Sequence, residues 1–184
     1  MMVSKPNVFI LEYKNNSWIS NIIKKITGTP YSHTAMYIED TFYELNGMGV
    51  NYRKEESTID RYIAADKIDV FAIDYIFNKK QIKKMKSWWD KNIELKKEYG
   101  YETLLLMLVR VPMRQLMRWY FVKRRKPFPI KLFRNEDVCS AAVDKCLKEG
   151  GCDIFPEFQE AGTSYPGLYA SKLKNNKIIS TYEL

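Results

Sequence analysis

Two adjacent segments constrain the fold of this chain more than any other feature of its sequence. Residues 33–39 (HTAMYIE) and 41–46 (TFYELN) are rich in β-branched and aromatic side chains, which favour strands, and only Asp40 separates them. This spacing predicts a tight hairpin. Strand-like composition also occurs in three further segments, residues 8–13, 49–52 and 67–73. The sequence therefore predicts an antiparallel sheet.

Helices are predicted in three places around this sheet. Residues 15–17 (NNS) offer N-cap oxygens to an amphipathic helix over 18–27. A second helix is predicted over 79–99, with apolar residues on one face and lysines on the other. A third is expected to open at Asn135 and to end at Gly150, as C-terminal glycines often mark. Strands and helices together predict the α+β class.

The charge of the chain is concentrated in one segment. Its 184 residues are 46% hydrophobic, which excludes the disordered and fibrous classes, and the net charge is +8. Residues 103–134 contain nine Lys or Arg and no acidic residue, so the rest of the chain sums to −1. We expect a basic amphipathic helical insertion at about 103–134 in a nearly neutral domain.

This cationic segment has three interpretations. It is a solvated helix, a membrane-surface helix or a nucleic-acid-binding patch. Aromatic residues 119–121 lie among its cations, and residues 104–109 (LLLMLV) add apolar surface, a mixture that favours anionic lipid over nucleic acid. No recognised nucleic-acid module surrounds it. The candidate anion-binding or membrane-binding residues are Arg118, Lys123, Arg124, Arg125 and Lys126.

The cysteine count and the N-terminus bear on location. Three cysteines, Cys139, Cys146 and Cys152, give no disulfide framework and favour a reducing compartment. The N-terminus lacks the pattern of a signal peptide, and the longest apolar run, 104–109, is far shorter than a spanning helix needs. We expect a cytoplasmic protein, with peripheral membrane attachment as an alternative, and the sequence does not indicate an oligomeric state.

His33 is the only histidine, so it concentrates every hypothesis that needs an imidazole. It begins one strand of the predicted hairpin. If the turn is centred on Asp40, Glu44 points to the opposite face of the sheet. A slip of one residue instead places Asn46 opposite His33 and Glu44 on the same-face diagonal. Glu39, Glu44 and Asn46 therefore all remain candidates to orient the imidazole.

Cys139 is the candidate nucleophile. It lies near the start of a predicted helix, where free amides and the helix dipole favour the thiolate. A cysteine in this position, paired with a histidine on a strand, is typical of nucleophilic catalysis. Cys146 and Cys152 fit the alternative of structural cysteines. There is no Cys-x-x-Cys spacing, so we expect neither a metal site nor a cofactor.

Three motifs carry a family resemblance: residues 31–38 (YSHTAMYI), 42–45 (FYEL) and 137–143 (DVCSAAV). In this order they resemble the circularly permuted branch of the NlpC/P60 superfamily of papain-like cysteine hydrolases, with its YiiX-like and poxvirus-type members. In the ordinary family the cysteine precedes the histidine. The opening helix and residues 164–169 (SYPGLY) are also similar to that branch. The resemblance implies one papain-like domain over 1–184, an antiparallel sheet or half-barrel packed by helices.

The resemblance also implies roles for single residues. Cys139 would be the nucleophile, His33 the general base and then acid, and Glu44 the residue that orients His33. Candidates for substrate or oxyanion contacts are Tyr31, Tyr101 and Ser140. Two features depart from the family: the long cationic insertion, and Glu102, which follows Tyr101 where members commonly carry Asp.

The predicted function is therefore a cysteine hydrolase that attacks an amide or acyl ester carbonyl through a thioester acyl-enzyme. The expected substrate is a peptide, an isopeptide or a lipid acyl group, since the family that the chain resembles includes amidases and lipid acyl-transfer enzymes. Neither the scissile bond nor the choice between hydrolysis and acyl transfer follows from the sequence. The alternative is a catalytically idle protein that docks on anionic membrane, or on nucleic acid, through its basic segment.

Overall fold

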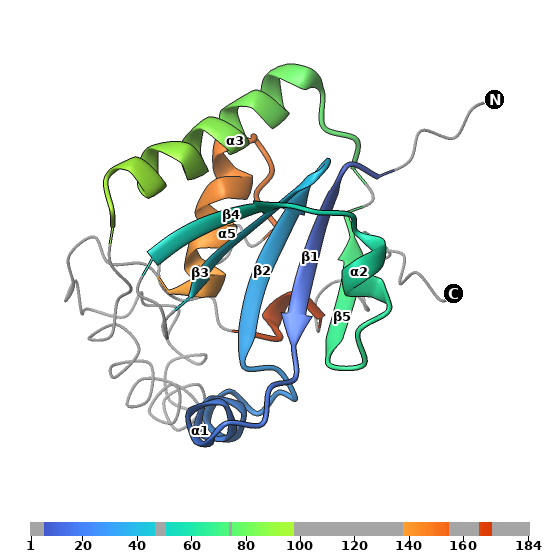
Figure 1. Ribbon diagram of the computed structural model, residues 1–184, viewed down its shortest axis with the longest axis vertical. Helices are drawn as coiled ribbons and strands as arrows, with labels where there is room; N and C mark the ends of the chain where they lie inside the picture. The colour runs from blue at the N-terminus through green and yellow to red at the C-terminus, as the bar shows by residue number, and fades with distance from the viewer. Residues whose placement is uncertain (1–5, 47–50, 74, 98–137, 155–165, 171–184) are drawn as a thin grey trace, which may run out of the picture.

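A five-stranded antiparallel sheet forms the centre of the structure, a computed structural model that describes residues 6–46, 51–73, 75–97, 138–154 and 166–170 (Figure 1). The order across the sheet is β4-β3-β2-β1-β5, and each neighbouring pair is antiparallel. The strands are β1 (Val8–Tyr13), β2 (His33–Ile38), β3 (Thr41–Asn46), β4 (Asn51–Glu56) and β5 (Ile68–Ala72). The predicted α+β class and antiparallel sheet are confirmed.

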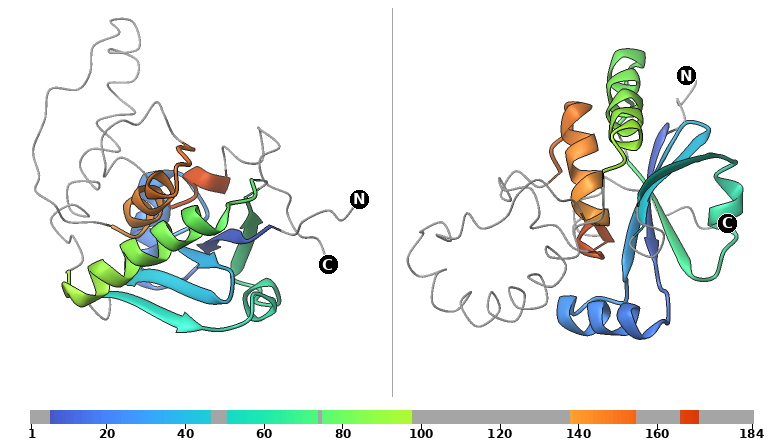
Figure 2. Two further views of the ribbon diagram at one scale, coloured as in Figure 1. Left: turned by 90° about the horizontal axis from the view of Figure 1, so that it is seen from above. Right: turned by 60° about the vertical axis from the view of Figure 1, so that its left-hand side comes forward.

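Helices cover both faces and one end of the sheet. They are α1 (Trp18–Thr27), α2 (Asp60–Ile63), α3 (Lys79–Glu94) and α5 (Cys139–Glu149). Helices α3 and α5 lie on one face, and the short α2 lies on the other (Figure 2). Helix α1 connects β1 to β2 and lies beneath the ends of these two strands (Figure 1).

Alternate side chains of each strand enter separate cores on the two faces, as the period of a strand requires. On the face of α3 and α5, Ile10, Met36 and Leu45 pack in a large cluster around Trp89. On the opposite face, Leu11 and Tyr37 join a smaller cluster with Tyr62 of α2. The sheet is thus buried on both sides, which fixes the positions of the strand ends that carry polar residues.

The β2–β3 hairpin resolves the register that the sequence left open. Met36 pairs with Tyr43 and Ile38 pairs with Thr41, so the turn is formed by Glu39 and Asp40 together. Glu39 adopts the left-handed conformation, with a φ of 56°. Continuing this register places Asn46 opposite His33 and Glu44 on the diagonal.

Two predicted boundaries differ from the structure, and one short helix was not predicted. The strand expected at 49–52 is β4, Asn51–Glu56, a charged edge strand whose sequence lacks clear alternation. The helix expected to reach residue 99 ends at Glu94, two residues before Lys96 takes a left-handed φ of 46°. The short α2 was not predicted, since four residues are too few for a periodic pattern.

Parts of the sequence predictions lie outside the described residues. These are the cationic insertion at 103–134 and the short strand expected at 178–180. Among the residues that the structure describes, no helix is long and apolar enough to cross a membrane.

Replacement of Trp89 tests the larger core. Its indole is fully buried, stacks on Tyr43 at 5.5 Å and meets Tyr52 edge-on at 5.2 Å. Trp89→Ala is expected to lower the free energy of unfolding by about 3–5 kcal/mol, because it leaves a cavity that the sheet cannot close. Urea denaturation measures this loss. Leu95→Ala, at a side chain that is 65% exposed, is the control and should change stability by less than about 0.5 kcal/mol; similar losses in both variants would contradict the described packing.

Candidate active site

Cys139 is the first residue of α5, and its side chain is buried. The first backbone bond of the helix runs from Ala142 N–H to the Val138 carbonyl oxygen (2.9 Å). The amides of residues 139–141 therefore lack an intrahelical acceptor, and Cys139 lies at the positive end of the helix dipole. The predicted start of this helix at Asn135 is wrong, because Val138 is the N-cap residue. The correction places Cys139 closer to the positive end of the helix dipole than the sequence indicated.

His33 is the first residue of β2 and faces both Cys139 and Glu44. Its Nε2 atom lies 2.9 Å from Glu44 Oε2, and its ring meets Tyr13 edge-on with centroids 5.3 Å apart. The imidazole also makes a hydrogen-bonding contact with the Cys139 sulfur. Because Nε2 is engaged by Glu44, Nδ1 is the nitrogen left for the sulfur. The three predicted catalytic residues are thus brought together.

Of the three candidates to orient His33, the structure places Glu44 on the imidazole. Glu39 lies in the hairpin turn, where its carboxylate binds Lys86 Nζ at 2.7 Å. Asn46, the last residue of β3, lies beyond the stretch over which β2 and β3 pair, and the carboxylate of Glu44 contacts the ring of His33. The diagonal position of Glu44, two residues along from Asn46, brings its carboxylate to the imidazole.

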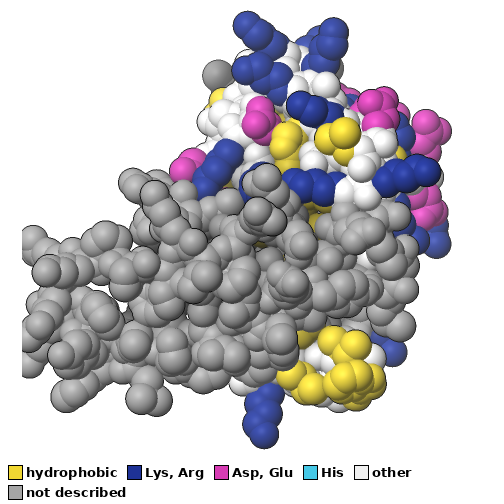
Figure 3. All heavy atoms as spheres, turned by 90° about the vertical axis from the view of Figure 1, so that its left-hand side faces the viewer, with side chains coloured by type: hydrophobic (Ala, Val, Ile, Leu, Met, Phe, Trp, Pro, Cys, Tyr) yellow, Lys and Arg dark blue, Asp and Glu magenta, His cyan; other side chains and the backbone are white. Residues whose placement is uncertain are grey.

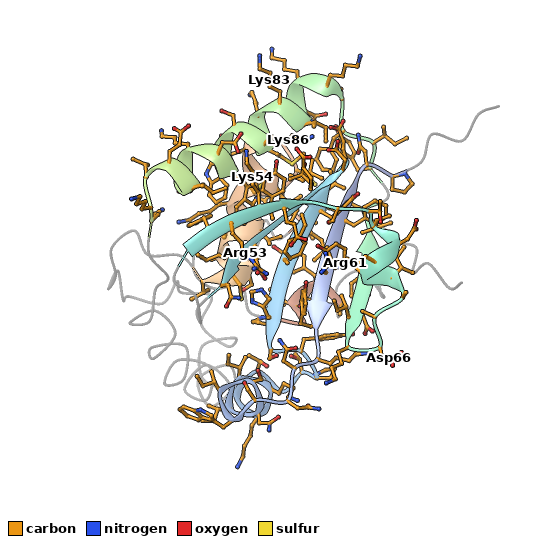
Figure 4. All side chains as sticks on the ribbon, viewed as in Figure 1. Arg53, Lys54, Arg61, Asp66, Lys83 and Lys86 are labelled. Carbon is orange, nitrogen blue, oxygen red and sulfur yellow. The ribbon has the colours of Figure 1, made fainter. Side chains whose placement is uncertain are left out.

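Arg53 is a member of the site that the sequence did not indicate. It is the cross-strand partner of Glu44 on β4, and its guanidinium forms an ion pair with Glu44 Oε1. Figure 4 shows Arg53 on β4, next to the strand that carries Glu44. The sequence did not indicate this pairing, because the charged pattern of β4 does not fix its register against β3. The carboxylate is therefore held from both sides.

Strands β2 and β3 separate at the end that carries the site. Within the described residues, β2 pairs with β1 along its whole length but with β3 only over Met36–Ile38. The two strands diverge toward this end, with α5 behind them (Figure 1). The Thr34 amide donates to the Cys139 sulfur, as does the Ser140 amide of α5. Backbone donors from a strand and a helix thus converge on one sulfur.

The electrostatics favour a charged pair. Burial raises the pKa of the Cys139 thiol, but His33 and the amides of Thr34 and Ser140 outweigh it, and the pKa falls below its usual value. Burial lowers the pKa of His33, but Cys139 and Glu44 outweigh it and raise that pKa to about 10. Burial also raises the pKa of Glu44, but His33 and Arg53 outweigh it, and the pKa falls below its usual value. These shifts all favour the charged forms, a thiolate at Cys139, an imidazolium at His33 and a carboxylate at Glu44.

The other two cysteines lack this environment. Cys146 is buried, with its thiol 3.8 Å from the Met85 carbonyl oxygen, and burial raises its pKa. Burial and the carboxylate of Asp153 raise the pKa of Cys152. Only Cys139 among the three is set up as a thiolate.

Glu12 is a second buried carboxyl, and the sequence analysis did not single it out. It is fully buried; Thr34 Oγ1 donates to its Oε2 atom (2.9 Å) and the Gly167 amide to its Oε1 atom (3.1 Å). Burial raises its pKa well above the usual value, and Cys139 adds to the rise. Gly167 has a φ of +85°, and a Cβ there would lie 2.6 Å from Thr29 Oγ1, so only glycine fits. Through this hydrogen bond to the Gly167 amide, Glu12 holds residues 166–170 against strand β1.

Two of the remaining candidates, Tyr31 and Ser140, lie among the described residues. The Tyr31 hydroxyl, expected near the substrate, donates instead to Asp69 Oδ2 at 2.5 Å and is buried. Ser140 is fully buried; its amide donates to the Cys139 sulfur, and its carbonyl oxygen accepts from the Tyr169 hydroxyl at 3.4 Å. Outside the described residues lie Tyr101 and the cationic candidates Arg118, Lys123, Arg124, Arg125 and Lys126.

Two further findings concern the site. Within the described part of the chain, no group of three His, Cys, Asp or Glu residues is arranged to hold a metal ion. Comparisons with protein-family models and with curated proteins found no match to this chain.

Glu12 makes a prediction about stability and pH. Its pKa is raised in the folded state, so the group favours folding while protonated and loses that contribution as pH rises above the unfolded value near 4.5. Wild-type stability should fall by up to about 1.4 kcal/mol per pH unit from this group. Glu12→Gln removes this slope, so the variant should gain on the wild type as pH rises. Urea denaturation from acid to mildly alkaline pH measures it.

The control for this experiment is Glu39→Gln, which changes an exposed turn carboxyl bonded to Lys86. The free energy of unfolding of Glu39→Gln, relative to the wild type, should not rise with pH as that of Glu12→Gln does. A Glu12→Gln difference that is constant across the pH range would show that Glu12 is ionised in the folded protein.

Proposed function

We propose that this protein is a cysteine hydrolase that cleaves an amide or acyl ester bond through a thioester acyl-enzyme. The observation that carries the proposal is the continuous contact from the Cys139 sulfur through His33 to Glu44, in which Nε2 and Oε2 are 2.9 Å apart. A nucleophile, a base in contact with it and a third group that orients the base are the parts that nucleophilic catalysis needs.

Acylation uses the resting ion pair. The Cys139 thiolate attacks the substrate carbonyl carbon, and a carbon–sulfur bond forms. The imidazolium of His33 then gives its proton to the leaving nitrogen or oxygen as the scissile bond breaks. The amide of Cys139, at the start of α5, is suited to stabilise the oxyanion of the intermediate.

Deacylation restores the pair. Water gives a proton to the neutral imidazole while its oxygen attacks the thioester carbonyl. The carbon–sulfur bond breaks, the acid product leaves, and Cys139 and His33 return to thiolate and imidazolium. Glu44 stays charged throughout and holds the ring through Nε2, and Arg53 restrains Glu44 in turn.

We also propose that the chain has the permuted NlpC/P60 type of papain-like fold. Three observations support this assignment. The histidine strand precedes the cysteine helix in the chain, α5 packs against β2, and the third residue lies on the next strand of an antiparallel sheet. Peptide, isopeptide and lipid acyl carbonyls all remain substrates of this chemistry.

Thiol labelling tests the proposed nucleophile. At neutral pH, iodoacetamide should modify Cys139 faster than Cys146 and Cys152, as quantified by peptide mass spectrometry. His33→Ala should slow labelling of Cys139 on the order of tenfold or more, because an unassisted thiol is only a few per cent ionised at pH 7. Glu44→Gln should slow it less, since the imidazole remains. Glu39→Gln is the matched control and should leave the rate unchanged.

The pH profile separates an ion pair from an ordinary thiol. In the wild type, the Cys139 rate should stay level from about pH 7 to about pH 9, since the pKa of His33 is raised to about 10 and the pair persists. In His33→Ala the rate should climb with pH. An inactive binding protein would instead show three thiols that react like ordinary cysteines, with no effect of His33→Ala on Cys139, and that result would refute the proposal.

A further inference from the structure

Helix α1 exposes an apolar face, which we define as Trp18, Ile19 and Ile22. The indole of Trp18 is 72% exposed, and Ile19 and Ile22 are 37% and 38% exposed. Their spacing places them on one side of the helix. Single exposed apolar residues are ordinary on protein surfaces, but three on one helix face, including a tryptophan, form a candidate interaction surface.

The helix itself is firmly held, so this exposure is not a frayed end. The Ser17 hydroxyl caps it by accepting from the Ser20 amide at 3.1 Å, and Ser20 is buried beneath it. At the other end Gly28 takes the left-handed conformation with a φ of 67° and closes the helix on the Lys24 carbonyl oxygen (3.0 Å). The α1 face is therefore part of a helix that is capped at both ends.

The charges on α1 are all of one sign. Residues 18–27 contain no Asp or Glu, and the last turn carries Lys24 and Lys25. Lys24 Nζ donates to the neutral Asn16 Oδ1 (3.0 Å), and Lys25 is exposed. Aromatic and aliphatic side chains on one face, with lysines and no acids beside them, match the interface of a bilayer that contains anionic lipid.

The position of α1 relates this face to the site. His33 begins β2 five residues after the helix is closed by Gly28, and α1 lies beneath the ends of β1 and β2 (Figure 1). Hydrophobic side chains gather at the same low end of the molecule in the space-filling view, with basic side chains beside them (Figure 3). A surface that contacts α1 would lie at the end of the sheet that carries the catalytic residues.

We propose that the α1 face is a docking surface for anionic lipid bilayers. Trp18 enters the headgroup region, Ile19 and Ile22 face the acyl boundary, and Lys24 and Lys25 bind lipid phosphates. This surface is built from residues 18–25, none of which belongs to the cationic segment at 103–134, and the proposal does not depend on the thiol chemistry. A bilayer is favoured over a second copy of the chain because facing copies would bring lysines of α1 near one another without acidic partners on that helix.

Vesicle flotation of the full chain tests this surface. Binding to phosphatidylcholine vesicles should rise when phosphatidylserine is included and fall when salt is raised. Trp18→Ser with Ile22→Ser should weaken binding on the order of a hundredfold, because two apolar side chains lose their burial in the bilayer. Ile76→Ser with Leu95→Ser, at exposed apolar positions outside α1, is the matched control and should bind like the wild type.

A second pair of variants separates α1 from the cationic segment. Lys24→Gln with Lys25→Gln should remove much of the phosphatidylserine dependence. Trp18→Phe keeps the face apolar, so this variant should still bind vesicles. It should lose the part of the fluorescence quenching by brominated lipid that comes from Trp18. Binding that is unchanged in every α1 variant, yet lost when Lys123, Arg124, Arg125 and Lys126 are neutralised, would overturn the proposal. A dimer in light scattering that Trp18→Ser dissociates, without vesicle binding, would also overturn it.

Failure of this inference is distinguishable from failure of the proposed function. Cys139→Ala should bind vesicles like the wild type. The Trp18→Ser with Ile22→Ser variant should keep the wild-type rate of Cys139 labelling by iodoacetamide, a soluble probe. The two assays are therefore independent of each other. An α1 variant that slowed Cys139 labelling would overturn the proposal, because it would show that the α1 face stabilises the catalytic site instead of binding a membrane.

Discussion

The contact between the Cys139 sulfur and His33 is the interaction on which the rest of the site depends. Moving two opposite charges out of water costs several kcal/mol for each ion unless neighbouring groups replace the lost hydration. Here the lost hydration is replaced by the amides of Thr34 and Ser140 at the sulfur and by the carboxylate of Glu44 at the imidazole. These groups come from β2, β3 and α5, so the pair exists only when the hairpin and the helix are both in place.

Glu12 is a carboxyl group near the Cys139 thiolate, where a second negative charge would be unfavourable. An ionised carboxylate beside the sulfur would disfavour the thiolate, and burial keeps the pKa of Glu12 high. Its oxygens still accept from Thr34 Oγ1 and the Gly167 amide. A protonated carboxyl can fill this position without opposing the Cys139 thiolate. Thr34 touches both groups, through its hydroxyl and its amide, so strand β2 couples the carboxyl to the nucleophile.

The sequence predicted most elements because their signals are local. Ser17 and Gly28 mark the ends of α1, and the strand segments of β1 and β3 were placed at their observed bounds. It could not select Glu44, because a shift of one residue reverses the face of every side chain, and the turn depends on Glu39 adopting a positive φ. Arg53 was missed because an exposed edge strand tolerates charge at every position. The start of α5 was misplaced because Asn135 offered a cap that Val138 does not.

Periodicity also cannot tell whether an apolar helix face is covered. The pattern of α1 resembles that of α3, whose apolar residues Met85 and Trp89 are fully buried, yet Trp18 is largely exposed. The difference lies in position, because α3 lies across a face of the sheet while α1 lies beneath its end, where few strand side chains are available to cover it. The end of a sheet is also where β2 and β3 diverge and where the polar groups that build the site come together. One geometric feature, the open end of the sheet, therefore accounts for both the reactive pair and the uncovered face beside it.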